Sequence, residues 1–219
     1  MSEGRKSYSE SLEEVKKDVL EMASLTEKGI CSSVEALENY DEELVQHIYN
    51  VEDESNKLNL EVEKECMRLV ALQQPVAKDL RFIATMMKIS DNFERICDLA
   101  EKIGKIAQKK GKKDPLKPLV DTNRMIDIIC EMLEIVKEAI EQEDTSDLRG
   151  LSDLDDKVDD LFSQIYNELI VFMVKDPKDV DEATDLVFVA RYLERSADLV
   201  AKIASRLVYM VEGERVQIK

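Results

Sequence analysis

Apolar side chains recur at intervals of three and four positions along most of the chain. That spacing places them on one face of an α-helix, so each long run of this kind predicts an amphipathic helix. We expect six helices, over residues 8–37, 41–72, 76–110, 120–142, 145–174 and 179–211. No stretch alternates between apolar and polar residues with a period of two, so we expect no strand.

Short polar segments separate these runs and contain residues that begin or end helices. Pro75 and Pro177 follow the second and fifth runs, and the residue before a proline is disfavoured in helical conformation. Asp41 is placed to cap the second helix, because an aspartate side chain accepts hydrogen bonds from the first free N–H groups. Thr145 lies in a turn of capping residues, so we start the fifth helix there.

The longest polar break, at residues 109–118, divides the chain into similar halves. It holds five lysines, one glycine and two prolines, a composition typical of a loop or a boundary between units. Residues 93–103 (FERICDLAEKI) recur 100 positions later as 193–203 (LERSADLVAKI), with six of the eleven positions identical. A repeat of this kind predicts two copies of one structural unit. We therefore expect an all-α fold of two tandem three-helix bundles, at residues 1–110 and 119–219.

Acidic identities in the two copies indicate a candidate metal site in each half. Glu94 and Asp98 stand four residues apart, which puts them one turn apart on one helix face. Glu194 and Asp198 repeat that pair. The preceding helix of each half carries a second polar cluster, made of Glu52, Asp53 and Asn56 in one half and of Asp155, Asp156 and Asp159 in the other.

Packing of these helices side by side would bring about four oxygen ligands together in each half. Oxygen ligands favour a hard cation such as ferric iron, magnesium, manganese or calcium, and zinc is tolerated. Asn56 stands where the second half has Asp159, so the first site should bind its ion more weakly.

The same carboxylates have a second interpretation as ordinary surface ion pairs. In a chain with 36% charged residues, carboxylates four positions apart also arise by chance. Arg95 and Lys102, with their counterparts Arg195 and Lys202, stand close enough in sequence to neutralise them. Such exposed pairs contribute roughly 0–1 kcal/mol each. The spacing alone leaves both interpretations open.

Charge and hydropathy exclude several classes of partner. The chain has 31 basic and 48 acidic residues, a net charge of −17, so it lacks the basic face that nucleic acid or an anionic membrane surface requires. No apolar run approaches the length of a membrane span, and the first residues contain no apolar segment typical of a signal peptide. We expect neither nucleic-acid binding nor membrane insertion.

Residues typical of catalysis are also missing from the sequence. His47 is the only histidine, whereas a di-iron oxidase built on a helical bundle needs Glu-x-x-His on two helices. The chain contains no glycine-rich phosphate loop and no nucleophile elbow. Four cysteines, Cys31, Cys66, Cys97 and Cys130, are scattered without a C-x-x-C pair, so we expect buried free thiols. We expect a protein that is not an enzyme.

Residues 73–107 (QQPVAKDLRFIATMMKISDNFERICDLAEKIGKIA) resemble the signature of the PhoU family of phosphate-transport regulators. Residues 183–204 (ATDLVFVARYLERSADLVAKIA) resemble the matching segment of that family's second half. The resemblance implies two three-helix bundles and a cytoplasmic, negative regulator of the high-affinity phosphate transporter. It implies docking on the transporter's ATP-binding subunit and, in many bacteria, on a phosphate-sensing histidine kinase.

The resemblance also implies multinuclear iron or zinc clusters on Glu/Asp-x-x-x-Asp motifs. Those motifs fall on Glu94 with Asp98 and on Glu194 with Asp198, and the opposing helices contribute the two polar clusters described above. We further expect a homodimer. Two alternatives stay open: a purely structural helical scaffold without metal, and a metal-storage or metal-dependent helical protein.

Overall fold

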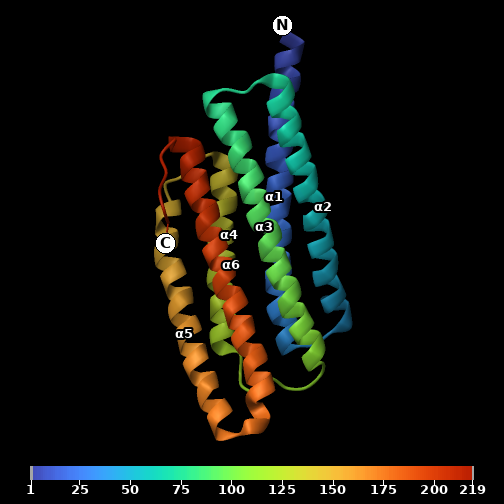
Figure 1. Ribbon diagram of the computed structural model, residues 1–219, viewed down its shortest axis with the longest axis vertical. Coiled ribbons are helices and arrows are strands. Elements are labelled where there is room, and N and C mark those ends of the chain that lie inside the picture. The colour runs from blue at the N-terminus through green and yellow to red at the C-terminus, as the bar shows by residue number, and fades with distance from the viewer. Residues whose placement is uncertain (1, 219) are drawn as a thin grey trace.

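The computed structural model describes the backbone of residues 2–218 and the side chains of residues 8–218. Within this part the chain forms six α-helices, α1 (Ser2–Glu38), α2 (Glu42–Gln73), α3 (Ala77–Lys110), α4 (Val120–Gln142), α5 (Leu151–Lys175) and α6 (Val180–Glu212). Two short 3₁₀ segments, η1 (Leu148–Gly150) and η2 (Pro177–Asp179), precede α5 and α6. The described residues contain no strand. All six helices run along the long axis, with α1–α3 on one side and α4–α6 on the other (Figure 1). The prediction of two tandem three-helix bundles is confirmed.

Most helix ends lie within a few residues of the predicted ones, because the local signals act as expected. Asp41 caps α2, and its side chain accepts a hydrogen bond of 3.3 Å from the backbone N–H of Glu43. Gln74 follows α2 in a left-handed conformation, with φ at 47°, immediately before Pro75. The first helix extends further toward the N-terminus than predicted, to Ser2.

The predicted start of the fifth helix at Thr145 is wrong. The α-helix begins at Leu151, after the 3₁₀ turn. Asp144 accepts hydrogen bonds from the backbone N–H and the hydroxyl of Ser146, at 3.0 and 3.1 Å. These bonds stabilise a local turn that competes with helix formation. Thr145 donates its hydroxyl to Glu212 of α6 at 2.6 Å, so its side chain joins two elements and caps neither.

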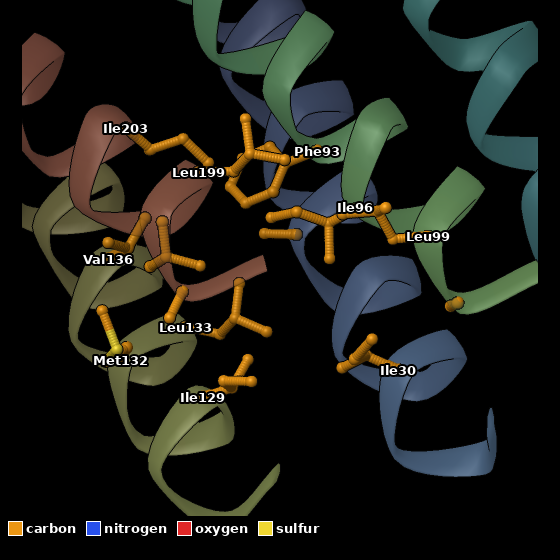
Figure 2. Close-up of a cluster of buried hydrophobic side chains, with 14 of the residues drawn as sticks. Ile30, Phe93, Ile96, Leu99, Ile129, Met132, Leu133, Val136, Leu199 and Ile203 are labelled. Atoms are coloured by element: carbon orange, nitrogen blue, oxygen red, sulfur yellow. The ribbon is translucent and has the colours of Figure 1, made fainter. Parts of the chain in front are cut away.

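One apolar core runs through both bundles. Phe93, Ile96 and Leu99 of α3 lie in the same buried cluster as side chains of α1, α4 and α6. Figure 2 shows this cluster, with Ile30 of α1, with Ile129, Met132, Leu133 and Val136 of α4, and with Leu199 and Ile203 of α6. Contacts between α3 and α6 and between α1 and α4 therefore bury the surface that joins the two halves. The division into units at 1–110 and 119–219 stays a prediction.

The four cysteines occupy two kinds of environment. Cys66 and Cys97 are buried, as predicted, whereas Cys31 and Cys130 are only half-buried. Cys31 of α1 and Cys130 of α4 face each other, with 2.7 Å between their sulfur atoms, and both line a surface pocket of about 240 Å³. All four thiols are free. The prediction of four buried thiols is therefore wrong for this pair, because the pocket between α1 and α4 exposes Cys31 and Cys130 to solvent in part.

We expect iodoacetamide to alkylate Cys31 in the native protein and to leave Cys66 and Cys97 unmodified. Burial raises the pKa of Cys66 to about 12 and also raises the pKa of Cys97, whereas a hydrogen bond from Cys130 lowers the pKa of Cys31. At pH 8, four units below its pKa, only about one Cys66 thiol in 10⁴ is the reactive thiolate. Peptide mass spectrometry gives the modified sites, and the unfolded chain, in which all four should react, is the control. Alkylation of native Cys66 at the rate of Cys31 would contradict this burial.

Candidate functional site

The two copies of the repeated motif lie side by side, on α3 and on α6. Leu99 and Leu199, which are identical in the two copies, are buried against the shared core. Three polar identities from each copy line one pocket of about 330 Å³ between the helices: Arg95, Asp98 and Lys102, with Arg195, Asp198 and Lys202. The repeat therefore has a structural meaning, because equivalent faces of the two halves meet there.

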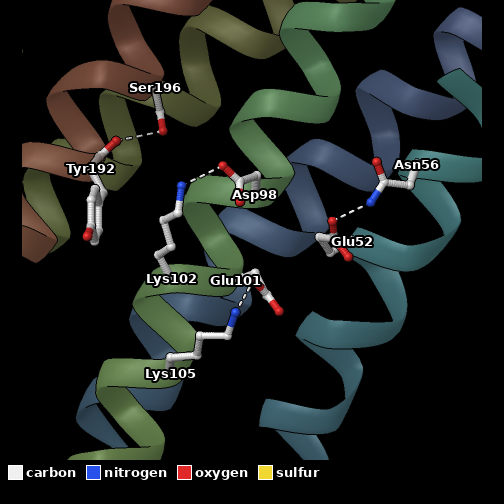
Figure 3. A network of polar contacts seen from close by, with 8 residues as sticks. All are labelled: Glu52, Asn56, Asp98, Glu101, Lys102, Lys105, Tyr192 and Ser196. Atoms are coloured by element: carbon white, nitrogen blue, oxygen red, sulfur yellow. Dashed lines mark hydrogen bonds and ion pairs between the residues drawn. The ribbon is translucent and has the colours of Figure 1, made fainter.

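The acidic side chains of the first half lie around α3: Glu52 approaches it from α2, whereas Asp98 lines the pocket between α3 and α6. Glu52 of α2 accepts a hydrogen bond from Asn56, one turn later on the same helix. Asp98 of α3 accepts a hydrogen bond of 2.6 Å from the ammonium group of Lys102 (Figure 3). Glu101, which the sequence analysis did not single out, lies beside them and forms an ion pair of 2.5 Å with Lys105.

These carboxylates are close enough to raise one another's pKa. Partial burial is the main cause that raises the pKa of Glu52, and the negative charges of Glu101, Asp53 and Asp98 raise it further. Burial and the charge of Asp98 likewise raise the pKa of Glu94. Glu52, Glu94 and Asp98 thus belong to one electrostatic cluster, while Asp53 is exposed.

In the second half, Glu194 of α6 lies near Asp159 of α5, whereas Asp198 lines the pocket between α3 and α6. Glu194 accepts a hydrogen bond of 2.5 Å from Arg191 through Oε1, whereas its buried Oε2 has no hydrogen-bond partner among the described residues. Burial raises the pKa of Glu194, and Asp198 and Asp159 add to this effect. Asp198 lies 3.7 Å from the ammonium group of Lys202.

The remaining candidates of the second half differ in burial. Asp155 of α5 is 3% exposed, whereas Asp156 and Asp159 are exposed. Asp155 thus lies among the buried residues of α5, together with Leu154 and Val158. Asp53, Asp156 and Asp159 are exposed, and Asp53 and Asp159 act on Glu52 and Glu194 through their charge.

The raised pKa values show how these clusters behave near neutral pH. A carboxyl group whose pKa is raised by folding holds its proton more tightly in the native state than in the unfolded chain. Its ionised form therefore lowers the stability of the native state. This loss grows as the pH rises from the pKa of the group in the unfolded chain to its pKa in the native state. Glu52, Glu94 and Glu194 are in this position. A cation bound between the carboxylates would offset the destabilising effect of burying their negative charges close to one another.

The donor chemistry suits a hard cation, but the side chains as they stand do not enclose one. In the part of the chain that the structure describes, no group of three or more His, Cys, Asp or Glu side chains is arranged to hold a metal ion. Lys102 forms an ion pair with Asp98, and Lys202 forms one with Asp198. The unpartnered Oε2 of Glu194 is the observation that fits a missing positive charge best.

Sequence reasoning missed two charged neighbours of the candidate sites. Glu101 follows Asp98 by three residues, and Arg191 precedes Glu194 by three, so both spacings were visible as neighbours on one helix face. Neither residue, however, has a counterpart of the same charge in the other half. Glu101 has Ala201 as its counterpart, and Arg191 has Asp91.

A family model described as the PhoU domain matches the chain twice, over residues 19–107 and 122–207. The phosphate-specific transport system accessory protein PhoU homolog of Aquifex aeolicus is 36% identical over 206 residues, covering 94% of this chain and 93% of the relative. The homolog of Clostridium acetobutylicum, which carries the same description, is 33% identical over 215 residues, with 98% of each chain covered.

Solved structures show the same architecture. The crystal structure of PhoU from Pseudomonas aeruginosa superposes with a TM-score of 0.90 at 27% identity, covering 94% of this chain and 100% of that one. The phosphate transport system regulatory protein PhoU from Streptococcus pneumoniae superposes with a TM-score of 0.86 at 26% identity, covering 95% and 99%. Across the described residues of this chain, none of the helices is long and apolar enough to cross a membrane.

Proposed function

The chain belongs to the PhoU family, and we propose that it regulates phosphate uptake as an accessory protein of a phosphate-specific transport system. The observation that carries this proposal is the match of the PhoU domain to both halves of the chain. Relatives that match over nearly the full length are named as accessory proteins of that system. We propose that the regulation is negative, so that the protein limits uptake and phosphate signalling when phosphate is plentiful.

The protein acts, in this proposal, as an adaptor on the ATP-binding subunit of the phosphate transporter. That subunit works at the cytoplasmic face, so the proposal places the protein in the cytoplasm. A phosphate-sensing histidine kinase is the second proposed partner, and the adaptor itself is proposed to be a homodimer. Light scattering from the purified protein measures the dimer directly, and a mass near that of one 25.1 kDa chain would contradict it.

A non-enzymatic role agrees with the relatives, which are named for accessory and regulatory functions. The helical-scaffold alternative requires no ligand and no partner, so association with the transporter would exclude it. The metal-dependent alternative requires an ion and a turnover reaction. A scaffold would leave phosphate uptake unchanged when the gene is deleted, whereas the adaptor predicts raised uptake in phosphate-rich medium.

We expect the purified protein to retain the ATP-binding subunit of the phosphate transporter in a pull-down, with the amount retained depending on phosphate. The physical reason is that a regulator must bind the states of its target with different affinities in order to shift their populations. The ATP-binding subunit of an unrelated importer is the control for specificity. Absence of association with and without phosphate, when both proteins are folded, would refute the adaptor role.

We also propose that the acidic clusters hold metal ions, one site in each half. The second site would use Glu194 and Asp198 of α6, with Asp155, Asp156 and Asp159 on α5. The first would use Glu94 and Asp98 of α3, with Glu52, Asp53 and Asn56 on α2. The mutual rise in pKa and the unpartnered Oε2 of Glu194 support the proposal.

Binding would require local rearrangement of the present ion pairs. Lys102 and Lys202 would have to release Asp98 and Asp198, since both ammonium groups now lie within 4 Å of those carboxylates. The exposed Asp53 and Asp156 would have to turn inward to contribute. Iron or zinc is the metal that the family resemblance implies, and oxygen ligands equally suit magnesium, manganese or calcium. The second site has more carboxylates and is expected to bind more tightly.

A further inference from the structure

We propose that a basic pocket between α3, α6 and the C-terminal segment binds a small anion with two or more phosphoryl groups. The pocket measures about 510 Å³, which is within the usual range of small-molecule sites. Its basic lining comes from Lys88 and Arg95 of α3, from Lys202 and Arg206 of α6, and from Arg215 in the segment after α6. This site adjoins the carboxylate clusters, because Arg95 and Lys202 also line the pocket that contains Asp98 and Asp198.

The charge of this pocket runs against the charge of the whole protein. The chain carries 48 acidic and 31 basic residues, so a basic side chain placed at random would usually meet a carboxylate. The pocket has five basic lining residues, of which Lys88 is paired with Asp91 and Lys202 with Asp198, so the three arginines supply an excess of three positive charges. Asp91 itself lies 3.6 Å from Lys88. Clustered cations in a concave surface attract multiply charged anions.

Two of these arginines have no ion-pair or hydrogen-bond partner in the described part of the protein, although the charge of Arg95 acts on the neighbouring Glu94. Within residues 8–218, neither Arg95 nor Arg206 forms an ion pair or a hydrogen bond. Many other basic side chains of the protein do form one: Lys102 bonds to Asp98, and Lys105 bonds to Glu101. A guanidinium group presents a planar fork of N–H donors that matches the oxygens of a phosphate. Unpaired arginines in a pocket are therefore suited to phosphoryl groups.

The segment after α6, which lines the pocket together with α3 and α6, is held against α6 by contacts near the end of the chain. Gly213 adopts a left-handed conformation with φ at 78°, which ends α6 and turns the chain back along it. Ile218 is 7% exposed, and its backbone N–H donates a hydrogen bond of 3.0 Å to the hydroxyl of Ser205. The guanidinium group of Arg215 lies over the ring of Tyr209, 5.8 Å from its centre. The segment is thus anchored on both sides of Arg215.

The charge and the lining together select the class of ligand. Three excess positive charges exceed what one phosphate ion, with about two negative charges at neutral pH, would neutralise, and they suit a diphosphate group. Tyr209 is the one aromatic residue of the lining, and its ring already faces Arg215. The lining therefore recognises the phosphoryl groups, and a nucleoside attached to them would add little.

The experiment is calorimetric titration of the full-length protein with pyrophosphate, in chelator so that bound metal does not contribute. We expect saturable binding that weakens as salt is raised, since the recognition is between charges in an open pocket. Arg95→Gln and Arg206→Gln should each weaken pyrophosphate binding about tenfold or more, corresponding to the loss of a charged hydrogen bond of about 1.4 kcal/mol. Both residues are exposed, so the variants should fold.

Lys105→Gln is the matched control, because Lys105 is an exposed base on α3 that does not line the pocket. It should bind pyrophosphate like the wild type. Titrations with ADP and with orthophosphate distinguish the possible sources of the phosphoryl groups. Equal affinity for ADP and pyrophosphate supports recognition of the phosphates alone, and orthophosphate should bind much more weakly.

Three results would overturn the proposal. The first is the absence of saturable binding of pyrophosphate and ADP by folded wild type. The second is binding that Lys105→Gln reduces as much as Arg95→Gln and Arg206→Gln do. The third is binding of orthophosphate as tight as that of pyrophosphate, which would rule out a ligand with two phosphoryl groups. Circular dichroism of each variant verifies that the helices are intact.

Discussion

Replacing Phe93 with alanine will lower the free energy of unfolding by about 3–5 kcal/mol. Phe93 is fully buried and is among the largest side chains of the core. It lies where α3 faces the other bundle, in the cluster that also contains Leu133 of α4 and Ile203 of α6 (Figure 2). Removing the ring loses its burial and leaves a cavity that long, mutually packed helices fill poorly.

Urea denaturation followed by circular dichroism measures this loss, which should appear as a lower midpoint with an unchanged slope. In a protein of this size the melting temperature should fall by roughly 6–20 °C. Phe188→Ala is the matched control, because Phe188 is 49% exposed and stacks only on Tyr192, with 6.1 Å between ring centres. Its loss should cost about 1 kcal/mol. Equal effects at the two positions would contradict the shared core.

Adding a suitable cation to chelator-treated protein will raise the free energy of unfolding, by about 2.7 kcal/mol for each site at a hundred times its dissociation constant. The gain follows because the ion binds the folded carboxylate cluster and has no comparable site in the unfolded chain. Asp198→Asn should remove the contribution of the second site, and Asp98→Asn that of the first. Bound metal is measured by elemental analysis, and stability by thermal unfolding with and without chelator.

The matched control for the metal experiment is Asp160→Asn, an exposed aspartate of α5 outside the candidate set. It should keep both the metal content and the stabilisation of the wild type. If wild type, Asp98→Asn and Asp198→Asn all carry no metal and respond equally to chelator, the carboxylates are a charged helix margin and the metal proposal is wrong.

Glu194→Gln separates electrostatic repulsion from metal binding within the same site. Burial and the nearby aspartates raise the pKa of Glu194, so ionised Glu194 lowers the stability of the metal-free native state above that pKa. The neutral amide lacks this effect. Metal-free Glu194→Gln should therefore be more stable than wild type at pH 7, and the difference should vanish as the pH falls below the ordinary glutamate pKa. With metal present, the order at pH 7 should reverse.

The sequence alone determined the helices and the existence of the repeat. The three-to-four spacing of apolar residues in α1 and α2 records which face is buried, because that periodicity is a local property of the helix. Asp41 and Pro75 mark the ends of α2 for equally local reasons. The start of α5 was misplaced because side-chain bonds at Asp144 stabilise a turn, and composition does not reveal which alternative wins.

The tertiary structure decided which of these faces meet. Interhelical contacts depend on how whole helices are packed, and neither spacing nor composition specifies that packing. The sequence showed two motif copies but not that Arg95 and Arg195 share a pocket. Cys31 and Cys130, 99 residues apart, became neighbours only when α1 packed against α4. The C-terminal segment carried no signal in the sequence, yet its fold over α6 places Arg215 in the basic pocket, because burial of Ile218 holds it there.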